Sequence, residues 1–167
     1  MHAALDQLSL PRPRVEQLLG TWHIVRTNFP MWLNPRNRAP RFEYGAIAGH
    51  DDRMSDCVRY RRGGRDKAIR GVDRQDPGRP CHFTWRGRGL LALLRSEWFV
   101  LELDGKAGLA AILFTETLFT PAGLDIVTRA ADPARELISA CVERLGRAPA
   151  LAKDLAELVE IDQALLV

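Results

Sequence analysis

Residues 18–32, LLGTWHIVRTNFPMW, decide the fold of this 167-residue chain. Gly20 permits a tight backbone turn that a larger side chain would strain. The residues that follow alternate between two faces, as in a strand, and one of these faces carries Trp22, Ile24, Arg26 and Asn28. Pro30 ends the pattern, because proline cannot donate a hydrogen bond to a sheet. The stretch therefore predicts a strand that follows a tight turn and has a tryptophan at its head.

Downstream of this strand, short apolar runs alternate with turn signals, which is typical of an all-β barrel or sandwich. Further strands are expected at residues 41–48, 54–61, 66–74, 81–86, 98–104, 108–117 and 123–129. Together with the opening strand this makes eight, the number that closes a barrel around one small ligand. All connections except the first are of hairpin length. The sequence thus predicts an eight-stranded antiparallel up-and-down β-barrel.

Two connections are unusually apolar. Residues 29–41 are rich in proline, asparagine and arginine and are expected to form a long loop, in which Met31, Trp32 and Leu33 could cap a cavity or insert into the core. Residues 87–97 contain LLALL, which could form a helical turn or an apolar loop. Its exposed leucines could act as a dimer contact or as a lid.

The periodicity changes after residue 129. Asp132 is a good N-cap, Pro133 suits the first helical position and Gly146 would stop the helix. One apolar stripe, which should pack on the outside of the barrel, comprises Leu137, Ile138, Cys141, Val142 and Leu145. Residues 158–162 are expected to extend beside the first strand. The chain then divides into an N-terminal arm (1–17), the barrel (18–129) and a C-terminal helix and tail (130–167).

Composition limits the class of protein. The chain is 46% hydrophobic, enough for one domain with a core, and no apolar run is long enough to span a bilayer. The first residues lack the pattern of a signal peptide, so a cytoplasmic location is expected. The three cysteines are widely spaced without a CxxC, which argues against disulfides and zinc. The net charge is +3, but acidic residues are interspersed among the arginines, which argues against nucleic-acid binding and is typical of bacterial GC-rich codon usage.

The two ends of the barrel pattern resemble the lipocalin family of calycin-like barrels. Gly20-Thr21-Trp22 resembles the family's GxW motif, and Arg129 on the last strand matches the arginine that stacks across that tryptophan. Residues 98–129 are most similar to bacterial lipocalins and apolipoprotein D-like proteins. The resemblance covers about residues 18–163. It implies a cup that carries a small hydrophobic molecule, although some such barrels act as isomerases, hydratases or cyclases on greasy substrates.

Arg26 is the most informative candidate site residue. If Trp22 points into the barrel, Arg26 lies on the same inner face, where an unpaired guanidinium would be costly. It then needs an inward carboxylate, such as Glu43 or Glu116, or the acid group of a ligand; the alternative is a solvated position near the open rim. On the ligand hypothesis, Arg26→Met should abolish binding of acids without affecting the fold.

The other candidates are aromatic and polar. Large rings with polar tips suit a ligand cavity, and the expected wall residues are Tyr44, Tyr60, Trp85 and Trp98. Asn28, Tyr60, Glu116 and Arg26 are the polar groups that could exchange protons if the protein is an enzyme. No metal-ligand spacing, cofactor motif or Ser-His-Asp order is visible.

The sequence therefore favours a barrel that binds a small hydrophobic molecule, which could carry an acid group. An isomerase or cyclase of a polyketide- or terpenoid-like substrate is the alternative. A protein-interaction module with a filled barrel is a third reading.

Overall fold

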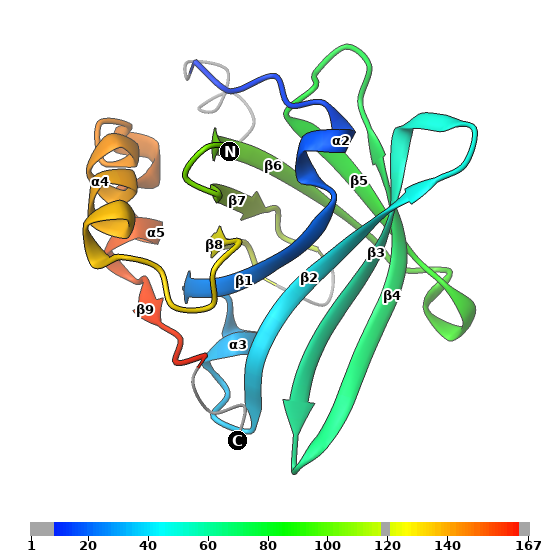
Figure 1. Ribbon diagram of the computed structural model, residues 1–167, viewed down its shortest axis with the longest axis horizontal. Coiled ribbons are helices and arrows are strands. Elements are labelled where there is room, and N and C mark those ends of the chain that lie inside the picture. The colour runs from blue at the N-terminus through cyan, green and yellow to red at the C-terminus, as the bar shows by residue number, and fades with distance from the viewer. Residues whose placement is uncertain (1–8, 118–120, 164–167) are drawn as a thin grey trace.

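The computed structural model describes residues 9–117 and 121–163. The barrel strands are β1 (Gly20–Thr27), β2 (Asn37–Ile47), β3 (His50–Arg62), β4 (Arg65–Gln75), β5 (His82–Gly87), β6 (Arg95–Asp104), β7 (Leu109–Phe114) and β8 (Gly123–Thr128). Each strand pairs antiparallel with the next, and β1 closes the barrel by pairing with both β2 and β8 (Figure 1). The fold is the predicted eight-stranded antiparallel up-and-down barrel with a C-terminal helix.

The remaining elements lie around the barrel. They are α2 (Val15–Leu18), α3 (Pro30–Leu33), η1 (Gly89–Leu91), α4 (Arg135–Leu145), η2 (Pro149–Leu151), α5 (Ala152–Ala156) and β9 (Val159–Glu160). The short strand β9 pairs with the second half of β1, as expected for the tail. Within residues 9–117 and 121–163, every helix is too short or too polar to span a lipid bilayer. Residues 1–8 of the predicted arm lie outside the described residues.

Several predicted boundaries are wrong, and two of them concern helices. The expected loop at residues 29–41 contains the helical turn α3, because Pro30 occupies its first position, and β2 already begins at Asn37. Helix α4 starts at Arg135 rather than at Pro133, because Ala134 still has an extended backbone with ψ of 135°. Both differences follow from the local backbone and leave the order of the elements unchanged.

The end of the barrel covered by α2 is sealed by Trp22 and Arg129. The guanidinium carbon of Arg129 lies 3.7 Å from the ring centroid of Trp22, the stacking that the sequence predicted. Arg129 also donates to the carbonyl oxygens of Thr21 and Gln17, both at 3.1 Å. Gly20 has a φ of +98°, and a Cβ there would lie 3.0 Å from the guanidinium. The glycine therefore permits both the turn and the close approach of the arginine.

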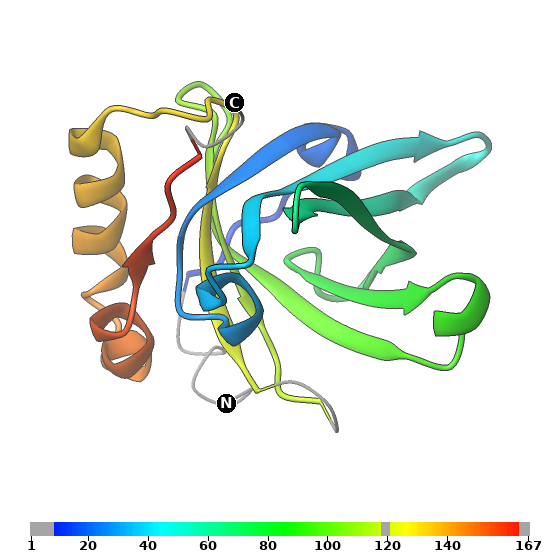
Figure 2. The same ribbon diagram turned by 90° about the horizontal axis from the view of Figure 1, so that it is seen from below.

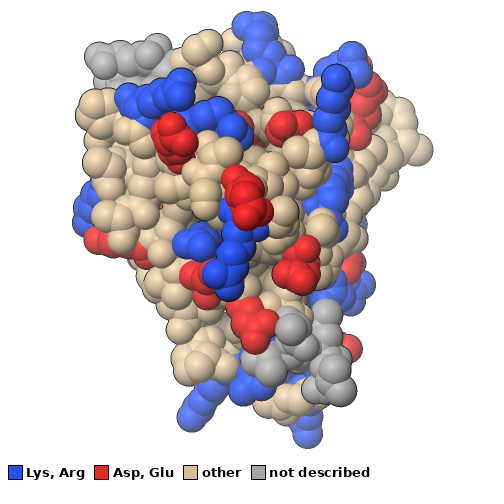
Figure 3. All heavy atoms as spheres, turned by 60° about the vertical axis from the view of Figure 1, so that its left-hand side comes forward, with Lys and Arg blue, Asp and Glu red and all other residues tan. Residues whose placement is uncertain are grey.

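Helix α4 packs against the outside of the barrel wall formed by β7, β8 and β1 (Figure 2). The predicted apolar stripe forms this contact, with Ile138, Cys141 and Leu145 buried against outward-facing residues such as Leu113 and Ile126. Acidic and basic side chains are intermingled on the face that carries this helix (Figure 3). The helix covers one wall and leaves the end of the barrel opposite α2 open.

A β-bulge in β1 changes which side chains point inward. The register of β1 against β8 shifts between Ile24 and Arg26. Ile24 belongs to the interior cluster, whereas Val25 packs beneath α4. An extra residue at a bulge reverses the phase of the residues that follow. Arg26 accordingly lies on the outer face, and the buried Thr27 takes the inward position.

Candidate ligand-binding cup

The inner face of the barrel is filled at one end and hollow at the other. Near the sealed end, Trp22, Ile24, Met54, Val100 and Ile112 are almost completely buried. Toward the open end lies a cavity of about 340 Å³. Its walls are Phe29, Met31, Trp32, Phe42, Tyr44, Asp56, Val58, Ile69, Trp85, Leu91, Leu94, Arg95, Ser96, Trp98, Phe114 and Thr117. The cup is therefore lined almost entirely by apolar and aromatic side chains.

A ladder of parallel rings forms the inner wall of the cup. The Trp98 indole stacks on Phe83 at 4.4 Å and on Tyr44 at 6.0 Å, with interplanar angles of 11° and 7°. Tyr44 in turn stacks on Phe42 at 5.8 Å. These rings come from β2, β5 and β6, whose inward positions alternate with outward ones. Rings held by neighbours on both sides give the cavity a rigid aromatic wall.

The connections at the open end form the lip of the cup. Met31 and Trp32 of α3 line the cavity, and Trp32 is also buried in the interior cluster, so it fits both alternatives that the sequence left open. Leu33 fits neither, because its side chain is exposed. The LLALL segment is divided: Leu91 and Leu94 line the cavity, whereas Leu90 and Leu93 are fully exposed to solvent. The segment thus forms part of the mouth of the cup and also exposes two leucine side chains beside the mouth.

Three of the predicted site residues meet in this cavity: Tyr44, Trp85 and Trp98. Tyr60 lies nearby, edge-on to Trp32 with ring centroids 5.6 Å apart, but it does not line the cavity. Glu116 is exposed on the connection that leads from β7 toward β8. The structure thus brings three of the aromatic candidates together in the cavity and places Tyr60 and Glu116 outside its lining.

Asn28 has a role outside the cup. Its Oδ1 accepts the backbone N–H of Leu124 at 2.6 Å, and its Nδ2 donates to Asp154 Oδ1 at 3.0 Å. Asn28 follows the last residue of β1 and therefore joins that strand to β8 and to α5. These contacts occupy both ends of its amide, so the side chain holds the barrel to the C-terminal segment.

The expectation that Arg26 points into the cup is wrong, because the bulge in β1 turns it outward. Its guanidinium forms an ion pair with Glu160 of β9 at 3.1 Å. Glu43, its expected inward partner, is also on the outer face, where it pairs with Arg41 and Arg59 at 3.0 and 2.5 Å. Arg26 belongs to the attachment of the tail.

Replacing Arg26 with methionine should therefore leave ligand binding in the cup unchanged. The half-exposed ion pair with Glu160 contributes at most about 1 kcal/mol to stability. The measurement is titration of a fluorescent fatty acid and of an uncharged probe into the wild type and Arg26→Met. If Arg26→Met lost affinity for the fatty acid but not for the uncharged probe, Arg26 would be part of the binding site.

Two buried carboxyl groups are the functional feature that the sequence reasoning missed. Asp56 lines the cavity and is 6% exposed, and Asp73 on the neighbouring strand is completely buried. Trp98 Nε1 donates to Asp73 Oδ1 at 2.7 Å. A signal was present, because Asp56 shares the inner face of its strand with Val58 and Tyr60. An acidic residue on an apolar face indicates either a paired charge or a site.

Burial perturbs both carboxyl groups. Burial raises the pKa of Asp56 well above its usual range, and the nearby charge of Asp73 raises it further. Burial also raises the pKa of Asp73 to about 7, while the hydrogen bond from Trp98 opposes the shift. Because like charges disfavour double ionisation, the two groups together retain a proton near neutral pH.

One oxygen of each carboxyl group and a neighbouring indole nitrogen have no hydrogen-bond partner among residues 9–117 and 121–163. They are Asp56 Oδ1, Asp73 Oδ2 and Trp85 Nε1. The Trp85 indole N–H approaches Asp56 and favours its ionised form, although the contact lacks hydrogen-bond geometry. A Cβ at Gly71 would lie 2.2 Å from Trp85 Nε1, so this glycine is what admits the indole. Buried polar atoms without partners mark a place where a ligand or water can bind.

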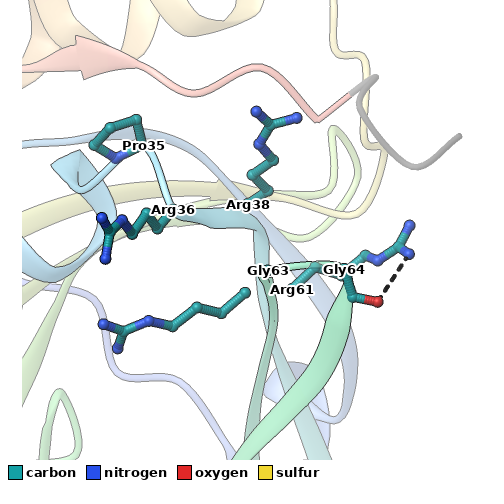
Figure 4. Close-up of a pocket in the computed structure, with 7 residues that line it drawn as sticks. Pro35, Arg36, Arg38, Arg61, Gly63 and Gly64 are labelled. Atoms are coloured by element: carbon teal, nitrogen blue, oxygen red, sulfur yellow. Dashed lines mark hydrogen bonds between the residues drawn. The ribbon is translucent and has the colours of Figure 1, made fainter.

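A second hollow, of about 600 Å³, lies outside the cup between the start of β2 and the β3–β4 hairpin. Its lining includes Arg36, Arg38, Arg61 and Arg62. The guanidinium groups of Arg36, Arg38 and Arg61 point in different directions, and Arg61 donates to the carbonyl oxygen of Gly64 (Figure 4). Because these cations do not converge on one point, the hollow is a weaker candidate than the cup.

The described residues contain no group of three His, Cys, Asp or Glu side chains that could hold a metal ion. The carboxyls of the cup form a pair rather than a ligand cluster.

No family model and no curated protein matches the sequence. Solved structures do. Lobster apocrustacyanin A1 has a TM-score of 0.67 at 16% identity, over 89% of this chain and 79% of that one. Insecticyanin from the tobacco hornworm Manduca sexta has a TM-score of 0.68 at 12% identity, over 92% and 82%. The siderocalin Ex-FABP, described as having dual ligand specificities, has a TM-score of 0.64 at 10% identity, over 87% and 93%. At such low identity these similarities define the fold alone.

Proposed function

We propose that this protein, whose chain has the lipocalin-like fold, binds a small hydrophobic molecule in the cup of its barrel. One observation carries the proposal: an apolar cavity of about 340 Å³ at the open end of an otherwise filled barrel. Cavities of this size, with few polar groups, are typical of small-molecule sites. The driving force is burial of apolar ligand surface, worth about 25 cal/mol per Å² before the costs of association.

Filling the cup should abolish binding. Ile69 lines the cavity from β4, so Ile69→Trp would occupy ligand space, whereas the exposed neighbour Ala68 points outward. Titration with an uncharged fluorescent probe such as Nile red should show affinity reduced by about tenfold or more in Ile69→Trp and unchanged in Ala68→Trp. Equal binding by both variants would place the probe on the outer surface and contradict the proposal.

The natural ligand can be sought by native mass spectrometry of protein isolated from its own host. A molecule that co-purifies in a 1:1 complex and is absent from Ile69→Trp would be the cargo of the cup. Arg26 was the residue expected to bind an acid group on the ligand. Because Arg26 lies outside the cup, it no longer supports that expectation. The hollow with the arginines also lies outside the cup.

The buried carboxyls favour a second candidate function, an isomerase or cyclase acting on a hydrophobic polyketide- or terpenoid-like substrate. Carboxyl groups whose pKa values are raised by burial, to about 7 for Asp73, can both donate and accept protons. Asp56, which lines the cavity, would exchange the proton, and Asp73 would set its charge. Incubation of the bound molecule in deuterated water distinguishes the two functions: turnover by proton transfer incorporates deuterium at carbon, whereas simple binding does not.

A further inference from the structure

The charge inside the cup has the opposite sign to the one that the sequence suggested. Asp56 contributes a carboxyl group to the cavity wall, and the completely buried Asp73 lies beside it. Arg95 is the basic residue of the lining, but its side chain is half-exposed at the mouth and pairs with Glu97 at 2.8 Å. Among the described residues, no lysine, arginine or histidine pairs with Asp56 or Asp73. The inner part of the cup is therefore acidic.

A buried carboxyl group without a partner lacks a positive counter-charge and hydrogen-bond donors, both of which a ligand can supply. Ionising a buried carboxyl is costly unless a positive charge or several hydrogen bonds accompany it. Asp56 Oδ1 and Asp73 Oδ2 have no hydrogen-bond donor among the described residues. Around them lie the rings of Tyr44, Trp85 and Trp98.

We propose that the ligand of the cup is a hydrophobic amine, whose protonated nitrogen binds against Asp56 between the rings of Tyr44, Trp85 and Trp98. This inference rests on the proposed ligand-binding function and adds the chemical class of the ligand. The apolar part of the amine would extend toward Met31 and Leu94 at the mouth. The ammonium would donate to the unpartnered carboxyl oxygen and supply the counter-charge that the chain does not provide.

Binding of an amine should be coupled to proton release. The titratable and charged groups that face Asp56 are Tyr44 on β2, Asp73 on β4 and Arg95 at the mouth, and Asp125 on β8 acts on Tyr44. The free cup retains protons because burial raises the pKa values of its carboxyls. A bound ammonium favours their ionised form, so affinity for amines should rise as pH rises through the range in which these carboxyl groups ionise.

The test compares two probes of the same shape, naphthylethylamine and naphthylethanol. Calorimetric titration of the wild type at about pH 8 should show the amine binding about tenfold or more tightly than the alcohol. Repeating the titration in buffers of different ionisation enthalpy should reveal proton release for the amine only. In Asp56→Asn the amine should bind no more tightly than the alcohol.

Two further variants complete the design. Asp66→Asn removes an acid of the same charge from the exposed β3–β4 hairpin and should retain the preference for the amine. Asp73→Asn can still accept the hydrogen bond from Trp98 but removes the like charge that raises the pKa of Asp56, so Asp56 should ionise more readily and the preference for the amine should persist.

The possible failures are distinguishable. If the wild type binds the alcohol as tightly as the amine, the cup is a binding site but the amine inference is wrong. The same conclusion follows if Asp56→Asn retains the preference for the amine. If neither probe binds the wild type, the proposed function fails together with the inference.

Discussion

Replacing Trp22 with alanine is expected to lower the free energy of unfolding by about 3–5 kcal/mol, the usual cost of removing a buried aromatic ring. Trp22 is 1% exposed, and its Nε1 donates to the carbonyl oxygen of Leu18 at 2.6 Å. The ring also carries the guanidinium of Arg129, which joins α2 to β1 through two backbone carbonyls. Its removal leaves a void at the sealed end and breaks the hydrogen bond to Leu18 of α2. Denaturant unfolding measures the effect.

Two variants divide this effect into its parts. Trp22→Phe retains an aromatic face beneath Arg129 but loses the hydrogen bond to Leu18, so its cost should be smaller. Arg129→Met removes the cation and its backbone hydrogen bonds without emptying the core. A cost for Trp22→Ala below about 1 kcal/mol, the range of surface substitutions, would mean that this end of the barrel does not depend on the ring.

The second large effect is a loss of stability as pH rises. Burial raises the pKa of Asp125 from 3.8 to about 7, against the hydrogen bond from Thr27 at 2.5 Å, and Asp73 is raised to a similar value. The unfolded chain releases these protons near pH 4, whereas the folded protein retains them up to about pH 7. The contribution of these two groups to the free energy of unfolding should therefore be highest below about pH 4. It should fall progressively as the pH rises to about 7.

Asp125→Asn isolates the contribution of one of these groups. An asparagine can still accept the hydrogen bond from Thr27 but has no charge to bury. A pKa difference of about three units corresponds to on the order of 4 kcal/mol, so the variant should be more stable than the wild type by up to that amount at about pH 8. At about pH 4 the two proteins should differ little. Parallel stability curves across this range would show that Asp125 is not protonated in the folded protein.

The barrel itself was predictable because alternation, turn residues and strand number all point to the same closed sheet. Gly20 and Trp22 locate the first strand, and Arg129 marks the last one a hundred residues later. Tyr44, Trp85 and Trp98 were candidates because large rings with polar tips suit a ligand cavity, and all three line the cup. These properties depend on local pattern, which a sequence records directly.

The polar side of the site could not be predicted in the same way. A single bulge after Ile24 reverses the phase of β1 and carries Arg26 to the outer surface, and no residue type announces that bulge. The proximity of Asp56 and Asp73 depends on the register between β3 and β4, in which Asp56 lies opposite Gly71. Periodicity gives the face of each strand but not the offset between two strands.

The closure of the barrel has a consequence for the order of events during synthesis. β1 pairs with β2 through residues 20–23, and beyond that point β9 occupies the same edge at residues 26 and 27. Gln163 bridges the two sides of this seam by donating to the carbonyl oxygens of Ile24 and Pro40. Its partner Ile24 precedes it by 139 residues. A nascent chain on the ribosome must therefore hold the edge of its first strand unpaired until almost all of the domain has emerged, and during that interval the edge is open to chaperones and to strands of neighbouring chains.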